Sequence, residues 1–203
     1  MNDTKKPDEW DLRDASSRSL DEFKECFSKV GEIKFPAKLV VFVAEMSKPG
    51  CLQFLAEKGY SMKEVDSSGE HPYYTAALAG KTENLKFLAT CGVETNDQRA
   101  LQGAVVNNHT NAVRTLVDLG AEPTEAVVNQ ALIFDTKEVA TYLLIEKNLP
   151  VSDKTRADLK SMYANKDTDG TAYEVLLKRD FKQKLEEQLK PSPTLKKSKT
   201  LKL

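Results

Sequence analysis

Asp66-Ser67-Ser68-Gly69-Glu70-His71-Pro72-Tyr73-Tyr74-Thr75-Ala76-Ala77-Leu78-Ala79-Gly80 is the most informative segment of this 203-residue sequence. Its polar first half has the composition of a turn, and its proline suits the first position of a helix. A second apolar segment at 84–89 follows, and Gly92 closes it. The segment predicts a helix, a tight turn and a second helix, which together have too little apolar surface for a core of their own.

The same unit recurs along the chain. Phe87-Leu88-Ala89 with Gly92 repeats 33 residues earlier as Phe54-Leu55-Ala56 with Gly59, and a similar ending lies 28 residues later at 115–120. A fourth copy ends on Asn148, which is second to glycine in the left-handed conformation that closes a helix. We expect helix pairs at 37–46 with 51–57, 74–79 with 84–89, 100–106 with 112–119, and 126–134 with 139–145. Small or apolar residues recur where neighbouring helices meet, so stacking the units gives one continuous core.

The second unit resembles the D-x-x-G-x-T-P-L-H-x-A-A-x-x-G motif of ankyrin repeats, and 85–96 continue the pattern without a gap. The chain departs from the family at His71, where threonine is usual, and at Tyr73-Tyr74, which replace Leu-His. The shortened later intervals remove most of the β-hairpin finger. The resemblance, which covers about 37–150, implies an all-α helical-repeat solenoid of four to five units that binds a protein and has no catalytic activity.

The ends of the chain are less regular. We expect residues 1–18 to be a flexible segment, 19–36 an N-terminal cap, 37–150 four repeats, 151–190 a C-terminal helical cap, and 191–203 a basic disordered tail. Ser19 with Glu22, and Thr171 with Glu174, have the spacing of capping boxes that open helices. The tail contains four lysines and no acid, and its Ser192-Pro193 is a minimal site for proline-directed phosphorylation.

Composition excludes several classes of function. Thirty basic and 31 acidic residues leave a net charge of −1, so a nucleic-acid partner is not expected, and the tail's lysines are weak evidence for one. The longest apolar run, 39–44, is far too short to span a membrane. The charged N-terminus lacks the features of a secretory signal. Three widely spaced cysteines are typical of free thiols in a reducing compartment, so we expect a cytoplasmic protein, with the nucleus as an alternative.

No group of residues predicts catalysis, a cofactor site or a metal site. The segment 165–170 resembles the start of a calcium-binding loop, but Leu176 stands where a bidentate glutamate is needed, so a polar turn before a helix explains it better. His71 is expected to cap a helix, and His109 lies in a turn between helices. No serine or cysteine has partners for a triad, and no phosphate-binding glycine loop is present.

The resemblance places the first helix of each unit on a concave face. On that face and the remaining finger we expect partner-binding residues at Glu45, Met46, Glu70, Tyr73, Leu78, Asn107, Ile133 and Phe134. The alternative for Ile133 and Phe134 is that they fill core space left by the missing finger. The expected function is a protein-binding adaptor or scaffold, with a structural subunit of a large assembly as the alternative and an enzyme or calcium sensor as a weaker one.

Overall fold

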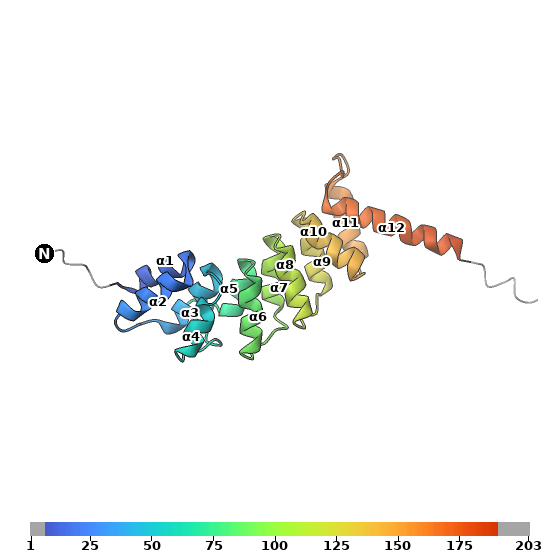
Figure 1. The fold of residues 1–203 in the computed structure, drawn as a ribbon. Helices are drawn as coiled ribbons and strands as arrows, with labels where there is room; N and C mark the ends of the chain where they lie inside the picture. The colour runs from blue at the N-terminus through green and yellow to red at the C-terminus, as the bar shows by residue number, and fades with distance from the viewer. Residues whose placement is uncertain (1–6, 191–203) are drawn as a thin grey trace, which may run out of the picture.

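A computed structural model describes residues 7–190, which form a row of antiparallel helix pairs (Figure 1). The pairs are α1 (Glu9–Arg18) with α2 (Leu20–Lys29), α3 (Pro36–Met46) with α4 (Cys51–Glu57), α5 (Pro72–Leu78) with α6 (Thr82–Thr90), α7 (Gln98–Val106) with α8 (Thr110–Asp118), α9 (Glu125–Ile133) with α10 (Lys137–Thr141), and α11 (Asp153–Met162) with α12 (Ala172–Leu189). A π-helical turn, η1 (Tyr142–Glu146), continues α10. Residues 7–190 contain no strand, so this part of the chain is all-α.

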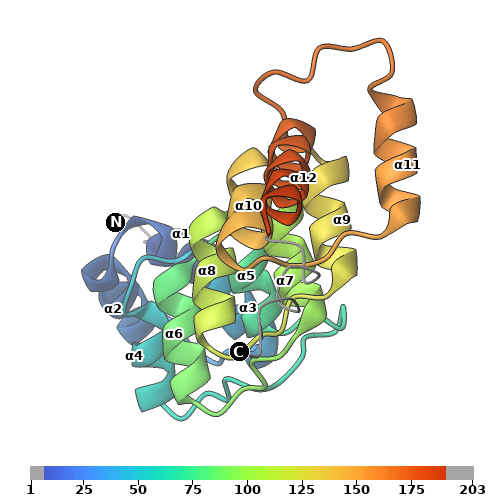
Figure 2. The ribbon, with the colours of Figure 1, turned by 90° about the vertical axis from the view of Figure 1, so that its right-hand side faces the viewer.

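The helices form two layers. In the inner layer α1, α3, α5, α7 and α9 pack side by side, and in the outer layer α4, α6, α8 and α10 do the same. Figure 2, in which the view runs along the length of the stack, shows the two layers. At the C-terminal end α11 packs against α9, whereas α12 packs against α10, η1 and α9. The expected solenoid with helical ends is therefore present.

The core is continuous along the stack, as the sequence predicts. The residue pairs expected at the helix contacts, Val43-Ala44, Ala76-Ala77, Ala104-Val105 and Ala131-Leu132, are all completely buried. Leucines of the outer helices fill the space between the layers, and Leu85, Leu88 and Leu116 are also fully buried. Each pair thus buries its apolar surface against the next pair.

Left-handed backbone positions end the repeats. Gly59, Gly92 and Gly120 have φ angles of 88°, 73° and 103°, and Asn148 takes the same region with φ 50°. The role of Asn148 as a glycine substitute is therefore confirmed. A second set of left-handed residues joins the inner to the outer helices, namely Gly80, Asn108 and Asp135.

The N-terminal segment differs from the expected flexible one. Within 1–18, residues 9–18 form α1, because Asp8 accepts hydrogen bonds from the backbone N–H groups of Trp10 and Asp11 while the Asp11 side chain accepts from the Asp8 N–H. This is a capping box built from two aspartates. Leu12 of α1 is fully buried, so α1 and α2 form a helix pair at this end of the stack. Residues 1–6 lie outside the described part.

The C-terminal pair has a capped helix and is fixed to the fourth repeat by polar contacts. The cap of α12 is Thr171, whose side chain accepts from the Glu174 N–H at 3.2 Å. The Asp135 carboxylate of the fourth repeat accepts from the Ala172 N–H at 2.6 Å. Arg179, which is 7% exposed, donates to the Leu149 carbonyl oxygen at 2.6 Å. These contacts hold the first half of α12. The predicted basic tail, 191–203, lies outside the described residues.

Gly80 gives a test of the turn between the layers. A Cβ at Gly80, whose φ is 69°, would lie 2.7 Å from the His109 ring, whereas a Cβ at Gly59, whose φ is 88°, would meet nothing within 4 Å. Gly59→Ala is expected to lower the free energy of unfolding by about 1 kcal/mol through backbone strain alone. Gly80→Ala is expected to cost about 2–4 kcal/mol, because steric overlap is added. Urea denaturation measures both, and equal losses would contradict the role of the His109 contact.

Candidate functional site

A row of apolar side chains lies at the carboxyl ends of the inner helices. Met46, Leu78, Val106 and Ile133 are the last residues of α3, α5, α7 and α9. Met46, Val106 and Ile133 are 45%, 38% and 57% exposed, and Leu78 is half-buried. Since these helices are neighbours in the inner layer, the row follows the length of the stack.

Of the other expected partner-binding residues, Phe134, Asn107 and Glu45 are next to residues of this row in the sequence, whereas Glu70 lies in a loop. Phe134 is 54% exposed in the turn after α9. Asn107 is exposed, although its amide donates to the Gly103 carbonyl oxygen at 2.9 Å. Glu45 is half-buried. Glu70 lies in the loop before α5 and forms an ion pair with Arg99 at 3.8 Å.

Tyr73 requires a correction. Its side chain is completely buried, its hydroxyl has no hydrogen-bond partner, and burial raises its pKa to about 12. It packs within the core and cannot contact a partner of the folded chain. The residue that reaches the surface is Tyr74, one position further along α5, where the Arg99 guanidinium lies 4.6 Å from the ring centroid.

Arg13 belongs to a cluster that sequence reasoning missed. Its guanidinium carbon lies 4.9 Å from the Trp10 ring centroid and 5.1 Å from that of Phe42. Arg13 is only 7% exposed, its Nε has no hydrogen-bond partner among residues 7–190, and Trp10 is 71% exposed. The aspartate capping box at 8–11 was the available signal, because it starts a helix that places Trp10 and Arg13 one turn apart.

A second arginine–aromatic stack occupies the middle of the inner layer. Tyr74 and Leu78 of α5 lie over Gly103 of α7, where an added Cβ would come within 3.2 Å of Leu78 Cδ1 and 3.5 Å of Tyr74 Cε2. The small residue at 103 therefore lets both side chains rest on the neighbouring helix. Arg99 covers Tyr74 and remains 60% exposed.

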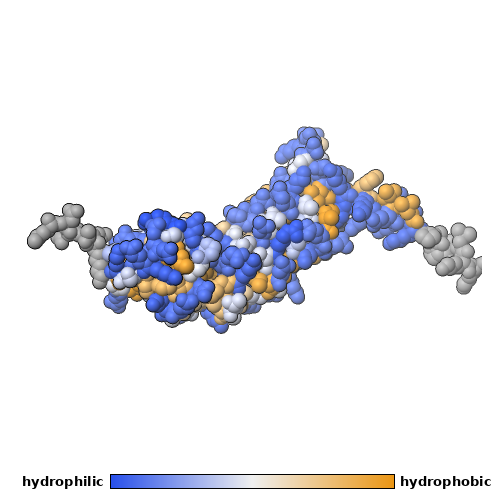
Figure 3. Space-filling view, viewed as in Figure 1, coloured by the Kyte–Doolittle hydropathy of each residue, from blue (hydrophilic) through white to orange (hydrophobic). Residues whose placement is uncertain are grey.

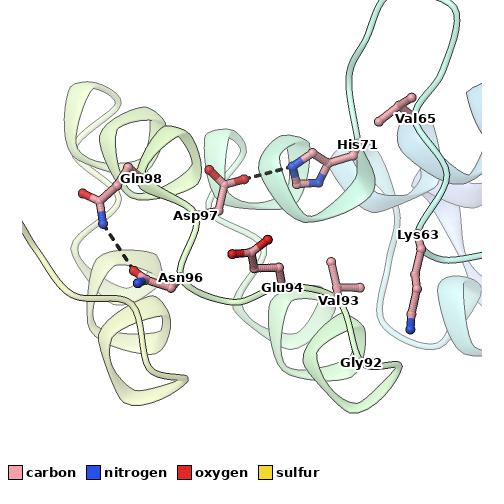
Figure 4. A pocket seen from close by; sticks show the side chains of 9 residues that line it. All are labelled: Lys63, Val65, His71, Gly92, Val93, Glu94, Asn96, Asp97 and Gln98. Atoms are coloured by element: carbon pink, nitrogen blue, oxygen red, sulfur yellow. Dashed lines mark hydrogen bonds and ion pairs between the residues drawn. The ribbon is translucent and has the colours of Figure 1, made fainter.

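A hollow of about 430 Å³ lies between the loops that precede α5 and α7 (Figure 4). Its lining is mostly polar and comprises Lys63, Val65, His71, Gly92, Val93, Glu94, Asn96, Asp97 and Gln98. Asn96 accepts hydrogen bonds from the Gln98 amide at 3.3 Å and from the Glu122 N–H at 3.1 Å. The floor of the hollow is thus tied to the next repeat.

His71 and Asp97 connect two helix N-termini beside this hollow. The His71 Nε2 and Asp97 Oδ2 atoms are 2.9 Å apart. His71 Nδ1 accepts from the Tyr74 N–H, so in the neutral ring Nε2 carries the proton and donates to Asp97. Asp97 also accepts from the backbone N–H groups of Arg99 and Ala100. The expected capping role of His71 is confirmed.

The remaining polar groups serve turns and caps. In the segment 165–170 the Asp167 carboxylate accepts from the Asp169 N–H, and the Gly170 N–H donates to Glu174. Among residues 7–190 there is no group of three or more His, Cys, Asp or Glu side chains that could hold a metal ion. Within the same residues no helix is both long enough and apolar enough to cross a membrane.

A family model described as ankyrin repeats in three copies matches residues 41–127. Residues 41–127 are therefore ankyrin repeats, and the fourth unit and the end pairs extend the stack beyond the matched residues. Ankyrin repeats are generally protein-interaction modules and typically have no catalytic activity. No curated protein matches this chain.

The Asp97 cap gives a second test. Asp97→Ala removes two capping hydrogen bonds and the contact with His71, so we expect the free energy of unfolding to fall by about 2 kcal/mol. Thr124→Ala is the matched control, because Thr124 is the N-cap residue of α9 but its side chain makes no capping hydrogen bond. It is expected to cost less than about 0.5 kcal/mol. Thermal and urea denaturation measure both, and similar losses would contradict the assigned role of Asp97.

The cysteines give a third test. Cys51 is completely buried, and burial raises the pKa of its thiol to about 11, so almost no thiolate forms near pH 8. Cys91 is only partly buried. Iodoacetamide at pH 8 is therefore expected to modify Cys91 of the native protein at least about tenfold faster than Cys51. Peptide mass spectrometry measures both rates, and urea-unfolded protein, in which both react, is the control.

Proposed function

We propose that this protein is a non-catalytic interaction module, an adaptor or scaffold that binds a protein partner through the inner-helix face. The observation that carries the proposal is the pair of arginine–aromatic stacks on the inner layer, Arg13 with Trp10 and Phe42, and Arg99 with Tyr74. Tryptophan, tyrosine and arginine are the residues most enriched at the energetic centres of protein interfaces.

The chemistry of the exposed Arg99 stack favours an acidic segment as the partner. The Tyr74 ring holds one face of the Arg99 guanidinium, which lowers the entropy lost when the N–H edge binds an acceptor. Carboxylates match that edge in a bidentate geometry. The apolar row that includes Met46 and Ile133 lies on the same inner helices and supplies surface for apolar side chains of the partner.

The alternative is a structural subunit of a larger assembly. The exposed apolar side chains at the end of α12, such as Phe181 at 72% and Leu189 at 73%, favour it, because permanent interfaces are more apolar than transient ones. A cytoplasmic location suits both functions and remains part of the proposal.

Affinity purification of the tagged full-length chain from its own cells, followed by quantitative mass spectrometry, tests the proposal. Arg99→Glu together with Ile133→Glu is expected to reduce a specific partner at least about tenfold, since a guanidinium anchor and an apolar contact are lost. Lys86→Glu on outer helix α6 is the control, because Lys86 is also exposed, and it should retain the partner. Several subunits at fixed ratio that survive a salt wash favour the structural role. A partner that both variants retain equally contradicts binding through the inner face.

A further inference from the structure

The second half of α12 extends beyond the stack. The helix is anchored by residues of its first half, where Ala172 and Leu176 are buried, whereas every residue at 181–190 is exposed. Figure 1 shows the helix projecting past α10, and Figure 2 shows it nearly end-on. One hydrogen bond, from the Gln183 amide to Asn148 Oδ1 at 3.4 Å, joins this end to a neighbouring part of the described chain, and its side chains are otherwise open to solvent.

The projecting end carries an apolar stripe, which consists of Leu177, Phe181, Leu185 and Leu189. Their exposed fractions are 42%, 72%, 46% and 73%. Apolar surface gathers at this end of the helix in Figure 3. Because the four residues are spaced by four, they form a single ridge of the kind that packs into the matching groove of another helix at a crossing angle of about 50°.

Charged residues border the stripe in a specific order. One edge holds Lys178, Lys182, Glu186 and Lys190, each directly after a stripe residue, and Lys182 and Glu186 form an ion pair at 3.9 Å. The other edge, three residues after each stripe position, holds Lys184 and Asp180, but the Asp180 carboxylate already pairs with Arg156 and Arg179. The first edge therefore carries both signs of charge.

We propose that the apolar stripe binds the same stripe of a second copy of this chain, with the two α12 helices antiparallel. A two-fold axis at the level of residue 183 places Phe181 opposite Leu185 of the second copy and Leu177 opposite Leu189. Along the first edge, Glu186 of one copy then lies between Lys178 and Lys182 of the other. This order of charges makes the surface complementary to itself.

The antiparallel direction follows from the position of the helix. A parallel pair would bring the two repeat stacks to the same end, although packed helices lie only about 8–10 Å apart. An antiparallel pair puts the stacks at opposite ends.

The size of the stripe sets the expected strength. Four apolar side chains per copy bury much less than the roughly 1,600 Å² of a standard interface, so the dimer is weak and dissociates on the order of ten micromolar. The inference does not rest on the proposed function, because the stripe belongs to α12 and the arginine–aromatic stacks lie on the inner helices. A dimer presents two inner faces at once and so binds a repetitive partner with avidity.

Sedimentation equilibrium of the full-length chain from about 2 to 300 µM tests the proposal across the range expected for a weak dimer. The mean mass is expected to rise from one chain toward two. Phe181→Ala with Leu185→Ala should raise the dissociation constant at least about tenfold, since both central contacts are lost. Phe134→Ala is the control, because Phe134 is similarly exposed but lies outside α12, and it should leave the dimer unchanged. Circular dichroism verifies that each variant is folded.

Charge exchange tests the direction of pairing. Lys182→Glu and Glu186→Lys alone are each expected to weaken the dimer at least about threefold, since each places like charges together at the edge. The triple exchange Lys178→Glu, Lys182→Glu and Glu186→Lys, which reverses all three signs and so again places opposite charges together across the two copies, should restore the affinity to within about twofold. A single-chain mass at every concentration, or a dimer insensitive to the stripe substitutions, overturns the proposal. A monomer that sediments with vesicles containing phosphatidylserine overturns it too and assigns the stripe to an anionic membrane.

Discussion

The close approach of the inner helices is the constraint on which the rest of this structure depends. Ala76, Ala77, Ala104 and Ala131 lie at the contacts and are completely buried, so each inner helix rests almost directly on the next. A larger side chain at these positions would separate the layers, because packed cores tolerate added volume poorly. The left-handed turns at Gly80, Asn108 and Asp135 then reverse the chain after equivalent residues of α5, α7 and α9. Because the inner helices are evenly spaced and end at equivalent residues, their last residues lie in a row.

Much of this arrangement was predictable from the sequence, because the repeat puts local propensity and packing in agreement. The four helix pairs, the left-handed Asn148 and the caps at Ser19 and Thr171 all follow from residue spacing. The surface was less predictable. Tyr73 and Tyr74 are adjacent and chemically identical, and only the rotation of α5 against its neighbours decides that the first is buried and the second meets Arg99. The α1 cap was missed because two aspartates formed a box usually read from serine or threonine with glutamate.

The environments of Arg13 and Arg99 differ, and the difference bears on the proposed binding through the inner face. Burying a guanidinium without a carboxylate is unfavourable, and the two aromatic rings offset only part of that loss. Arg99 by contrast remains mostly exposed and already forms an ion pair with Glu70. The Arg13 Nε is buried, so a partner at the first stack meets the exposed Trp10 ring, whereas the Arg99 guanidinium is open to an acidic group that displaces Glu70. In the proposed interface the second stack therefore contributes more selectivity for charge than the first.

The two exposed apolar features of this chain differ in how the fold explains them. The row on the inner helices is a by-product of repetition, since each inner helix must end somewhere near the same edge. The stripe on α12 has no such origin, because Asp135 and Arg179 already anchor the helix within its first half. The next ten residues, 181–190, are all exposed, so ordering them as a helix costs conformational entropy that no burial offsets unless another surface covers them. Their regular spacing and ordered flanking charges are the properties expected of a helix that packs against another helix.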